Sequence, residues 1–429
     1  MKEIYQPNKE QWKALTARPI LSTDSLNESV STILKEVREK GDQAIQRFTS
    51  LFDGVQLSYF CVKENEISEA VQRVSPQIKK AIAIAASNIK QFHQVQLVDE
   101  IEVETMGGVR CWRKSVGIEK VGLYIPGGTA PLFSTLLMLG IPAQLAGCKQ
   151  IVLCTPCDKN GKVNDVILYT AKFLGITTIF KIGGAQAIGA LAYGTETVPQ
   201  VYKIFGPGNQ YVTKAKELVQ TQGIAIDMPA GPSEVLIIAD QNADAEYLAA
   251  DLLSQAEHGV DSQVVLLSTS KSKIEQVKVA LSNQLQDLPR RELAEKTLEN
   301  SMLIAFETLN ECIEFSNEYA PEHLILNIDN AEQYVDAITN AGSVFLGAFS
   351  CESAGDYASG TNHTLPTNGF AKSYSGVSVD SFVKKITFQT LTAQGLRNIG
   401  KTIEIMAEAE QLIAHKNAVS IRLKKIGNE

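Results

Sequence analysis

Short apolar runs alternate with amphipathic helical stretches along most of this chain. From Lys120 onward, one series at intervals of about 25 to 30 residues consists of VGLYIPG, QIVLCTP, TTIFKIG and KIFGPG. After Gly231, a second series consists of VLIIAD, QVVLLST, MLIAFE, HLILNI and SVFLG. This alternation is typical of parallel sheets, because two parallel strands need a crossover connection between them. The sequence therefore predicts an α/β fold with two doubly wound parallel-sheet modules, each an incomplete Rossmann-like unit.

The same rhythm divides the chain into segments. Residues 26–48 and the stretch that begins at Ser75 and Pro76 carry apolar side chains at helical spacing, so packing helices are expected there. GVRCWRKSVG, residues 108–117, predicts a hairpin or an edge strand. The end of the chain is expected to hold one helix, roughly 393–414, in an arm that reaches a partner subunit. The expected division is a small N-terminal helical segment (1–20), a first α/β domain (21–120 with 235–376), a second α/β domain (121–234) and a C-terminal arm (377–429).

The composition is that of an ordinary globular protein, and it narrows the range of partners. The 429 residues are 44% apolar and 21% charged, which is enough apolar material for sizeable cores. A formal net charge of −8 and the lack of a basic cluster argue against a nucleic-acid partner. The N-terminus shows no apolar signal core, and no apolar run reaches the length of a membrane span. We expect a cytoplasmic protein with neither a nucleic acid nor a membrane as partner.

Seven cysteines are scattered along the chain, and this odd number does not resemble a disulfide framework. Reduced thiols are therefore expected. Cys154 and Cys157 form CTPC, a spacing that is found in redox dithiols and in half of a zinc knuckle. No second pair follows, so the interpretation that we favour is that the two residues end a buried strand.

The stretch IDMPAGPSEVLIIADQNADAEYLAADLLSQAEH, residues 226–258, combines a rigid turn, a buried strand and a helix. Gly231 between two prolines predicts a tight turn ahead of the apolar strand. In the helix that follows, Asp251, Gln255 and His258 recur at the spacing of one helical face. This polar stripe is either a solvated surface, which is the more common case, or a source of metal ligands. The local sequence leaves both interpretations open.

Three strand-end loops are rich in glycine: YIPGGTAP, IGGAQAIGALAYG and FGPGNQYV. Loops at the carboxyl ends of parallel strands form ligand crevices, and glycine there lets backbone amides approach a phosphate. None of the three is a complete GxGxxG, so each alone is equally consistent with a tight turn. Their combination in one module, with Tyr124, Gln186 and Asn209 offering ring and amide contacts, favours a dinucleotide. The chain shows no GxxxxGKS or GxxxxGKT motif, which argues against a P-loop nucleotide triphosphatase.

Candidate acids and bases lie in the second half of the chain. YAPEHL places Glu322 and His323 immediately before a strand, where they are either an exposed pair or two proton-transfer groups in one cleft. Residues 348–369 form a long Gly-, Ser- and Asn-rich segment without periodicity, which is typical of a functional loop. The further candidates are Asp356 and His363 in this segment, and Glu410 and His415 near the end of the last expected helix.

In these motifs the chain resembles the histidinol dehydrogenase family. The resemblance rests on IDMPAGPSEVLIIAD followed by LLSQAEHG, together with YIPGG, GGAQAIGALAYGT, GPGNQYV, YAPEHL and the final AHKN. It runs in order from about Lys120 to near the end of the chain, and residues 226–258 are its most specific part. The family implies an oxidoreductase that converts L-histidinol through L-histidinaldehyde to L-histidine, the last step of histidine biosynthesis, with reduction of two NAD. It also implies one zinc ion per subunit and a homodimer.

Matched position by position, the resemblance implies roles for the candidates. Glu322 and His323 correspond to the proton-transfer residues, and the C-terminal arm is expected to complete the active site of the partner subunit. The zinc would lie on the first α/β domain and NAD on the second. One departure, Thr361 where proline is also common, touches no assigned role. The implied sets are the zinc ligands Gln255, His258, Asp356 and His415; the NAD contacts Tyr124, Gln186 and Asn209; and the substrate contacts Ser233, Gln255, His258, His323, Asp356, Glu410 and His415.

As a hypothesis, neutral His323 removes the hydroxyl proton in the alcohol step, and Glu322 activates the water that hydrates the aldehyde. A rival mechanism uses a cysteine thiolate. Its candidates are Cys111, Cys148 and Cys351, of which only Cys111 has cationic neighbours in the sequence. Alternative functions are a zinc- and NAD-dependent dehydrogenase of another small alcohol, a zinc hydrolase and a nucleotide-binding protein. The hydrolase leaves the glycine-rich loops without a purpose, and the binding protein leaves the acid, base and metal set unexplained.

Overall fold

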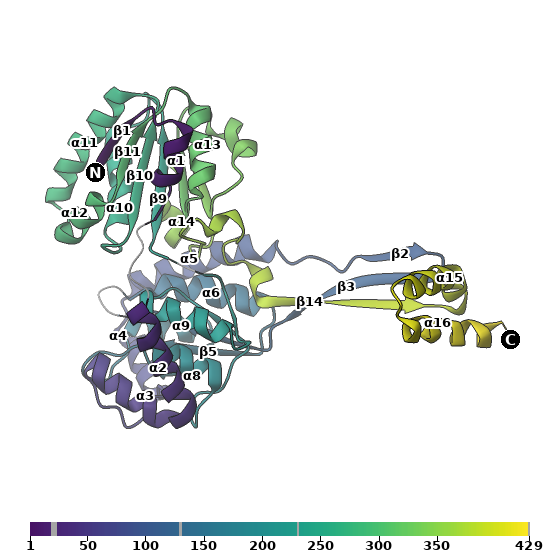
Figure 1. The fold of residues 1–429 in the computed structure, drawn as a ribbon. Helices are drawn as coiled ribbons and strands as arrows, with labels where there is room; N and C mark the ends of the chain where they lie inside the picture. Colours follow the sequence, from purple (N-terminus) through teal and green to yellow (C-terminus); the bar gives the residue numbers. More distant parts are fainter. Residues whose placement is uncertain (19–23, 128–130, 230, 428–429) are drawn as a thin grey trace.

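The computed structural model describes residues 1–18, 24–127, 131–229 and 231–427. Figure 1 shows two lobes and a long ribbon that carries two helices away from both of them. The expected boundary at residue 20, residues 128–130 of the YIPGGTAP loop and Ala230 of the MPAGP turn lie outside the described residues. No helix in the described ranges is long and apolar enough to cross a membrane. All seven cysteines are free thiols, as expected.

The first lobe is a five-stranded parallel sheet with the strand order β6-β5-β4-β7-β8. Successive residues of a strand point to opposite faces, so Val152 and Cys154 face one apolar core and Leu153 faces the other. Both faces of the sheet are therefore covered, as the apolar runs predicted. The strands are β4 (Lys120–Tyr124), β5 (Gln150–Thr155), β6 (Thr178–Lys181), β7 (Lys203–Phe205) and β8 (Ala225–Ile226). The helices between or after them are α6 (Phe133–Leu145), α7 (Asp165–Phe173), α8 (Gly184–Tyr193) and α9 (Gln210–Gln220).

Four early helices pack on this first lobe: α2 (Asp24–Lys40), α3 (Asp42–Phe48), α4 (Glu64–Arg73) and α5 (Pro76–Gln94). Helix α2 lies against α8 and α9, α4 against α7, and α5 against α6. The close approach of α2 to α8 depends on Gly189, where an added Cβ would come within 3.2 Å of Leu34 and Val37. The expectation that these helices join the later module is therefore wrong. Apolar spacing predicts which face of a helix is buried, but not which module buries it.

The second lobe is a six-stranded parallel sheet with the order β1-β11-β10-β9-β12-β13. Strand β1 (Lys2–Tyr5) pairs with β11, so the N-terminal segment contributes a strand as well as helix α1 (Lys9–Leu15) and is not simply helical. Four residues at a sheet edge carry too weak a pattern to be recognised before their partner is known. The other strands are β9 (Glu234–Ala239), β10 (Gln263–Ser268), β11 (Met302–Ala305), β12 (His323–Asn327) and β13 (Ser343–Leu346). The helices are α10 (Ala245–Ala256), α11 (Lys271–Gln286), α12 (Arg291–Glu299), α13 (Leu309–Tyr319) and the 3₁₀ segment Ala331–Ala337.

The strand order of the first sheet recurs in the second, which has β1 in addition beside β11. In each lobe the first strand of the series, β4 or β9, lies in the centre, the second and third strands lie to one side, and the fourth and fifth to the other. This is the order of an incomplete Rossmann-like unit, with its reversal between the first and fourth strands. The fold class predicted from the sequence is thus confirmed, and the shared order agrees with the similar rhythm of the two series.

The arm is an antiparallel ribbon of β2 (Glu102–Met106), β3 (Val109–Gly117) and β14 (Val383–Leu391) that ends in α15 (Ala393–Ala409) and α16 (Ile413–Ile426). The hairpin or edge strand expected at residues 108–117 is not found, because these residues form the single strand β3, which lies between β14 and β2 in the ribbon. Two features of the expected arm need correction, since β14 was not predicted and the single last helix is two helices. The helix breaks because Gln411 has a left-handed backbone with φ of 60°. Strand β3 pairs with all nine residues of β14, which is the long-range contact that forms this strand.

Candidate active site

The candidate proton-transfer residues lie at the amino edge of the second sheet, where β9 begins with Glu234 and β12 with His323. Helix α14 (Glu352–Tyr357) and the chain that follows it cover this edge and also contact the first lobe. His363 Nε2 lies 2.9 Å from Thr135 Oγ1 of α6, and Asn362 donates a hydrogen bond of 2.7 Å to the Met138 carbonyl of the same helix. Helix α6 follows the carboxyl end of β4, so the site lies between the glycine-rich edge of the first sheet and the amino edge of the second.

Three side chains form a cluster that can hold a metal ion. Ligand atoms of His258, Glu352 and Asp356 all lie within 4.8 Å of one another. Glu352 and Asp356 are four residues apart on α14 and therefore share one face of it, whereas His258 lies two residues beyond the end of α10. Among the described residues, the buried Asp356 Oδ1 and His323 Nε2 have no hydrogen-bond partner, although they are 3.5 Å apart. Imidazole and carboxylate donors with unsatisfied buried atoms fit a zinc ion.

Glu352 is the member of this cluster that the sequence analysis missed. The segment around it was interpreted as an aperiodic loop, and only Asp356 and His363 were singled out in it. The spacing of Glu352 and Asp356, which the helix turns into neighbours, was the available signal. Glu352 is buried, with 1% of its surface exposed, so its carboxyl group faces the cluster rather than water.

Gln255 is buried in α10 beside this cluster. With its amide placed so that both ends find partners, the nitrogen donates to Glu352 Oε1 and the oxygen accepts from the Glu234 N–H at 3.1 Å. The solvated-face alternative is wrong for two positions of the polar stripe, because Asp251 and Gln255 are both buried. His258, the third position of the stripe, is exposed at the rim of the cluster.

Glu322 and His323 are both buried, contrary to the alternative of an exposed loop pair. Glu322 Oε2 accepts a hydrogen bond of 2.9 Å from the Glu234 N–H and lies 3.6 Å from His323 Nδ1. His323 Nδ1 is also 3.1 Å from the carbonyl oxygen of Glu234. The other ring nitrogen faces Asp356. The imidazole is therefore held between a backbone carbonyl and the metal-ligand cluster.

The electrostatics separate these acids into two kinds. Burial raises the pKa of Glu322 to about 8, and burial likewise raises the pKa of Glu352 to about 8. Burial also acts on Asp356, but the neighbouring imidazoles, led by His323, hold its pKa below the usual value. For His323, burial lowers the pKa, but the carboxyl groups of Glu352 and Glu322 outweigh it and raise the pKa well above its usual value. Asp356 is thus suited to remain an anionic ligand, and Glu322 to exchange a proton near neutral pH.

His363, which had no assigned role, orients the Asp356 region. Its Nδ1 is 2.8 Å from the Asp356 carbonyl oxygen and its Nε2 reaches Thr135 on the first lobe. Burial lowers the pKa of His363, which favours the neutral ring that can donate at one nitrogen and accept at the other. The residue therefore ties α14 to α6.

The remaining sequence candidates divide between the cleft and the arm. Ser233 lies immediately before β9, and its carbonyl accepts a hydrogen bond of 3.1 Å from the Gln263 N–H. Glu410 ends α15 and His415 lies in α16, and Figure 1 shows both helices at the far end of the ribbon, away from α14. The structure of one chain therefore does not bring Glu410 or His415 to its own metal-ligand cluster.

The glycine-rich edge of the first sheet carries the three residues expected to contact a dinucleotide. The Tyr124 hydroxyl accepts a hydrogen bond of 3.1 Å from the Gly184 N–H at the start of α8. Gln186 is buried, and within the described part of the chain both ends of its amide lack a partner. Asn209 is exposed and caps α9 through hydrogen bonds from the backbone N–H groups of Tyr211 and Val212. An unsatisfied buried amide at a helix N-terminus is consistent with a bound cofactor.

Asp251, the stripe residue without an assigned role, yields a prediction about stability. Burial raises its pKa to about 6, above the value of about 3.8 in an unfolded chain. The native state therefore loses stability as the pH rises from 4 to 6, by at most about 3 kcal/mol. We expect Asp251→Asn to be more thermostable than the wild type at pH 8 and no more stable at pH 4. If the variant and the wild type had equal melting temperatures at pH 8 as well as at pH 4, the Asp251 carboxyl would be solvated in the native state.

The two doubly wound lobes and the metal-ligand, acid and base set between them define a metal- and dinucleotide-dependent dehydrogenase. A family model described as histidinol dehydrogenase matches residues 16–423. The histidinol dehydrogenase of Bacteroides thetaiotaomicron is 57% identical over 426 residues, which are 99% of this chain and 100% of the relative. That of Mannheimia succiniciproducens is 50% identical over 99% of this chain and 98% of its own length. A crystal structure of the enzyme from Elizabethkingia anophelis superposes with a TM-score of 0.97 and 56% identity, and covers 100% of this chain and 99% of that one.

The chain belongs to the histidinol dehydrogenase family. It is accordingly a zinc- and NAD-dependent oxidoreductase of histidine biosynthesis. The resemblance seen in the sequence motifs is confirmed, and it extends over nearly the whole chain.

Proposed function

We propose that this chain oxidises L-histidinol through L-histidinaldehyde to L-histidine in the cleft between its two lobes. The observation that carries the site assignment is that His258, Glu352 and Asp356 converge within 4.8 Å beside the buried pair Glu322 and His323. When bound, Zn²⁺ supplies a cation for the imidazole and amine of the substrate, and NAD supplies the hydride acceptor.

For the metal, we propose Gln255, His258 and Asp356 from one subunit and His415 from its partner. Glu352 adds a candidate beside this set, because its carboxyl shares the α14 face with Asp356 and contacts the Gln255 amide. For NAD, we propose Tyr124, Gln186 and Asn209 on the first lobe. Ser233 and, from the partner, Glu410 are the remaining substrate contacts in this proposal.

Proton transfer is assigned to the buried pair. His323 takes the hydroxyl proton of the alcohol at Nε2, because Nδ1 is occupied by the Glu234 carbonyl. The carboxyl groups of Glu352 and Glu322 favour the protonated ring, and a bound Zn²⁺ beside Glu352 and Asp356 would oppose them and favour the neutral ring that a base requires. Glu322, whose pKa is raised to about 8, takes the proton of the water that adds to the aldehyde. Two groups of different pKa in one cleft thus serve the two oxidation steps.

A homodimer with shared active sites is proposed from the arm. Among the described residues of α15 and α16 and the turn between them, large apolar side chains are exposed by 44 to 59%, which is more than a solvated helix pair requires. A partner subunit that covers them would bring Glu410 and His415 to the cleft of the other chain. The exposed residues are Ile405, Met406, Leu412, Ile413 and Ile421.

The thioester alternative finds little support. Burial raises the pKa of Cys148 to about 11, so its thiol stays protonated and is a poor nucleophile. Cys111 lies on β3 of the arm ribbon. Cys351 is the N-cap residue of α14, directly before Glu352.

We further propose a cytoplasmic location and a division of the chain that follows its packing. In this division, one domain comprises residues 24–94 and 118–226, which carry the cofactor side. The other comprises residues 1–18 and 231–376, which carry the metal ligands and the proton-transfer pair. The arm comprises residues 102–117 with 383–427.

The reaction is tested with purified protein, L-histidinol and NAD, by following NADH absorbance with and without a chelator. We expect two NADH per histidinol and loss of turnover when zinc is removed, with recovery on adding Zn²⁺. One NADH per histidinol would indicate a simple alcohol dehydrogenase, and turnover that survives complete zinc removal would contradict the metal assignment.

A further inference from the structure

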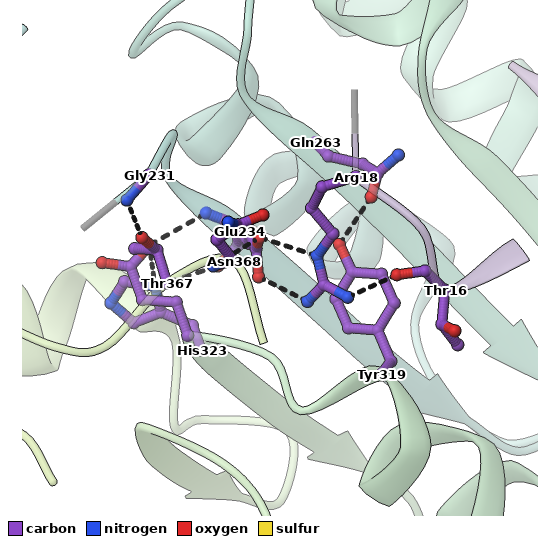
Figure 2. Close-up of polar contacts among 10 residues, drawn as sticks. Thr16, Arg18, Gly231, Glu234, Gln263, Tyr319, His323, Thr367 and Asn368 are labelled. Atoms are coloured by element: carbon purple, nitrogen blue, oxygen red, sulfur yellow. Dashed lines mark hydrogen bonds and ion pairs between the residues drawn. The ribbon is translucent and has the colours of Figure 1, made fainter. Parts of the chain in front are cut away.

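A buried ion pair lies directly behind the proton-transfer residues. Arg18 Nε and Nη2 donate hydrogen bonds of 2.8 Å each to the two carboxylate oxygens of Glu234 (Figure 2). The side chains are 9% and 1% exposed, so the pair is almost fully withdrawn from water. The same carboxylate accepts a hydrogen bond of 2.9 Å from the Asn368 N–H, at the end of the segment that covers the cleft. The Glu234 carboxylate at the start of β9 is thus hydrogen-bonded both to Arg18 of the N-terminal segment and to Asn368 of the chain that follows α14.

The backbone of Glu234 contacts the two proton-transfer groups. Its N–H donates to Glu322 Oε2 at 2.9 Å, and its carbonyl accepts from His323 Nδ1 at 3.1 Å. The second contact keeps a proton on Nδ1 and leaves Nε2 free to face Asp356. Main-chain contacts from one residue therefore set the position of the acid and both the orientation and the tautomer of the imidazole.

Arg18 is itself held in a fixed orientation. Its guanidinium carbon lies 3.5 Å from the centre of the Tyr319 ring, and Nη1 donates a hydrogen bond of 2.7 Å to the Thr16 carbonyl. The Tyr319 hydroxyl in turn donates a hydrogen bond of 2.7 Å to Gln263 Oε1 on the neighbouring strand β10 (Figure 2). A planar guanidinium that is stacked on one face and bidentate at its edge allows the carboxylate little freedom.

The Arg18–Glu234 pair is not well explained by a contribution to stability, because two buried charges lose more hydration on folding than an apolar pair of the same shape. None of the reacting groups proposed above touches Arg18. What the pair does fix is the start of β9, the point from which Glu322 and His323 are held.

We infer that Glu234, clamped by Arg18, is a positioning residue that holds Glu322 and His323 in the geometry required for both oxidation steps. This inference rests on the proposed function, since it concerns how that reaction is supported. A misplacement of about 1 Å can cost a factor of about 10² in rate, so loss of the clamp should act on turnover before it acts on substrate binding. Both steps should slow by similar factors, because the contacts of one residue hold both groups.

The test separates geometry from folding by comparing single and double replacements. Arg18→Met leaves a buried carboxylate unpaired and should lower the melting temperature. Arg18→Met/Glu234→Met removes both charges and should regain much of that loss, yet kcat should remain about 10- to 100-fold below the wild type. Zinc content should be retained and the KM for histidinol should change less than about threefold. Val277→Ala, a buried change in α11, serves as a control that loses stability without losing kcat.

A spectroscopic measurement follows the imidazole without any turnover. The chain has five histidines, so protein labelled with ¹⁵N-histidine gives few ring signals, and His323→Gln assigns the one of interest. We expect a ring N–H signal of His323 Nδ1 that is protected from exchange in the wild type and lost or shifted in the double variant.

The outcomes are distinct. A double variant with kcat within threefold of the wild type, or with an unchanged His323 signal, would overturn the positioning role, as would loss of kcat in proportion to loss of zinc. If the wild type itself fails to form two NADH per histidinol, the proposed function fails, and the ring signal still decides whether the clamp orients His323.

Discussion

Replacing Glu322 by glutamine is expected to slow oxidation of L-histidinaldehyde by a factor of about 10² to 10⁴ and to slow oxidation of L-histidinol much less. The amide keeps the size of the side chain and can still accept from the Glu234 N–H, so the fold and the position of His323 are preserved. It cannot take a proton from water, however, and hydration of the aldehyde loses its base. Single-turnover measurements that start from the alcohol and from the aldehyde separate the two rates.

The matched control for this prediction is Glu352→Gln. It makes the same carboxyl-to-amide change at a second buried acid of the same site, and burial raises the pKa of both carboxyls to about 8. Because Glu352 lies with the metal ligands, its replacement should lower zinc content and slow both steps together. Equal slowing of both steps by Glu322→Gln, with zinc retained, would contradict the assignment of Glu322 to the hydration step.

The strands were predictable because their apolar runs are long enough to be buried on both faces. Every run named in the two series became a strand of the expected sheet. The placement of α2 to α5 was not predictable, since their apolar stripes do not say which sheet they cover. The decisive detail is a contact, Gly189 against Leu34 and Val37, between residues far apart in the sequence. Strand β14 was not predicted for a related reason: its partner β3 lies more than 260 residues away in the sequence.

The motif YAPEHL was enough to name Glu322 and His323 as candidates, and the structure shows that both are buried and lie close together. The site was less predictable where function depends on burial. Asp251 and Gln255 look like a solvated stripe in the sequence, and only the structure shows both of them buried. Glu352 and the Arg18–Glu234 pair were missed because no local pattern distinguishes a buried acid from an exposed one. Arg18 and Glu234 are 216 residues apart in the sequence, and Glu352 lies near His323 of another element, 3.9 Å from its Nδ1.

The second large effect is expected from mixing two inactive variants. Under the proposed roles, His415→Asn should lack a metal ligand and Glu322→Gln should lack the base for hydration, so each variant alone should have little overall turnover. The arm places His415 far from the metal-ligand cluster of its own chain, which is the physical reason to expect that it serves the partner (Figure 1). Co-expression with two different tags, followed by purification on both, isolates the mixed dimer.

In a mixed dimer with shared sites, the site on the Glu322→Gln chain contains both replacements. The site on the His415→Asn chain contains its own intact Glu322 and the intact His415 of its partner. About half of the wild-type turnover per dimer should therefore return. If each chain supplied its own His415, both sites would keep one defect and no turnover would return. The mixed dimer of Glu322→Gln with Glu322→Gln/His415→Asn is the control, because no arrangement of its arms produces an intact site. The recovery thus distinguishes an arm that completes the partner's site from one that only holds the dimer together.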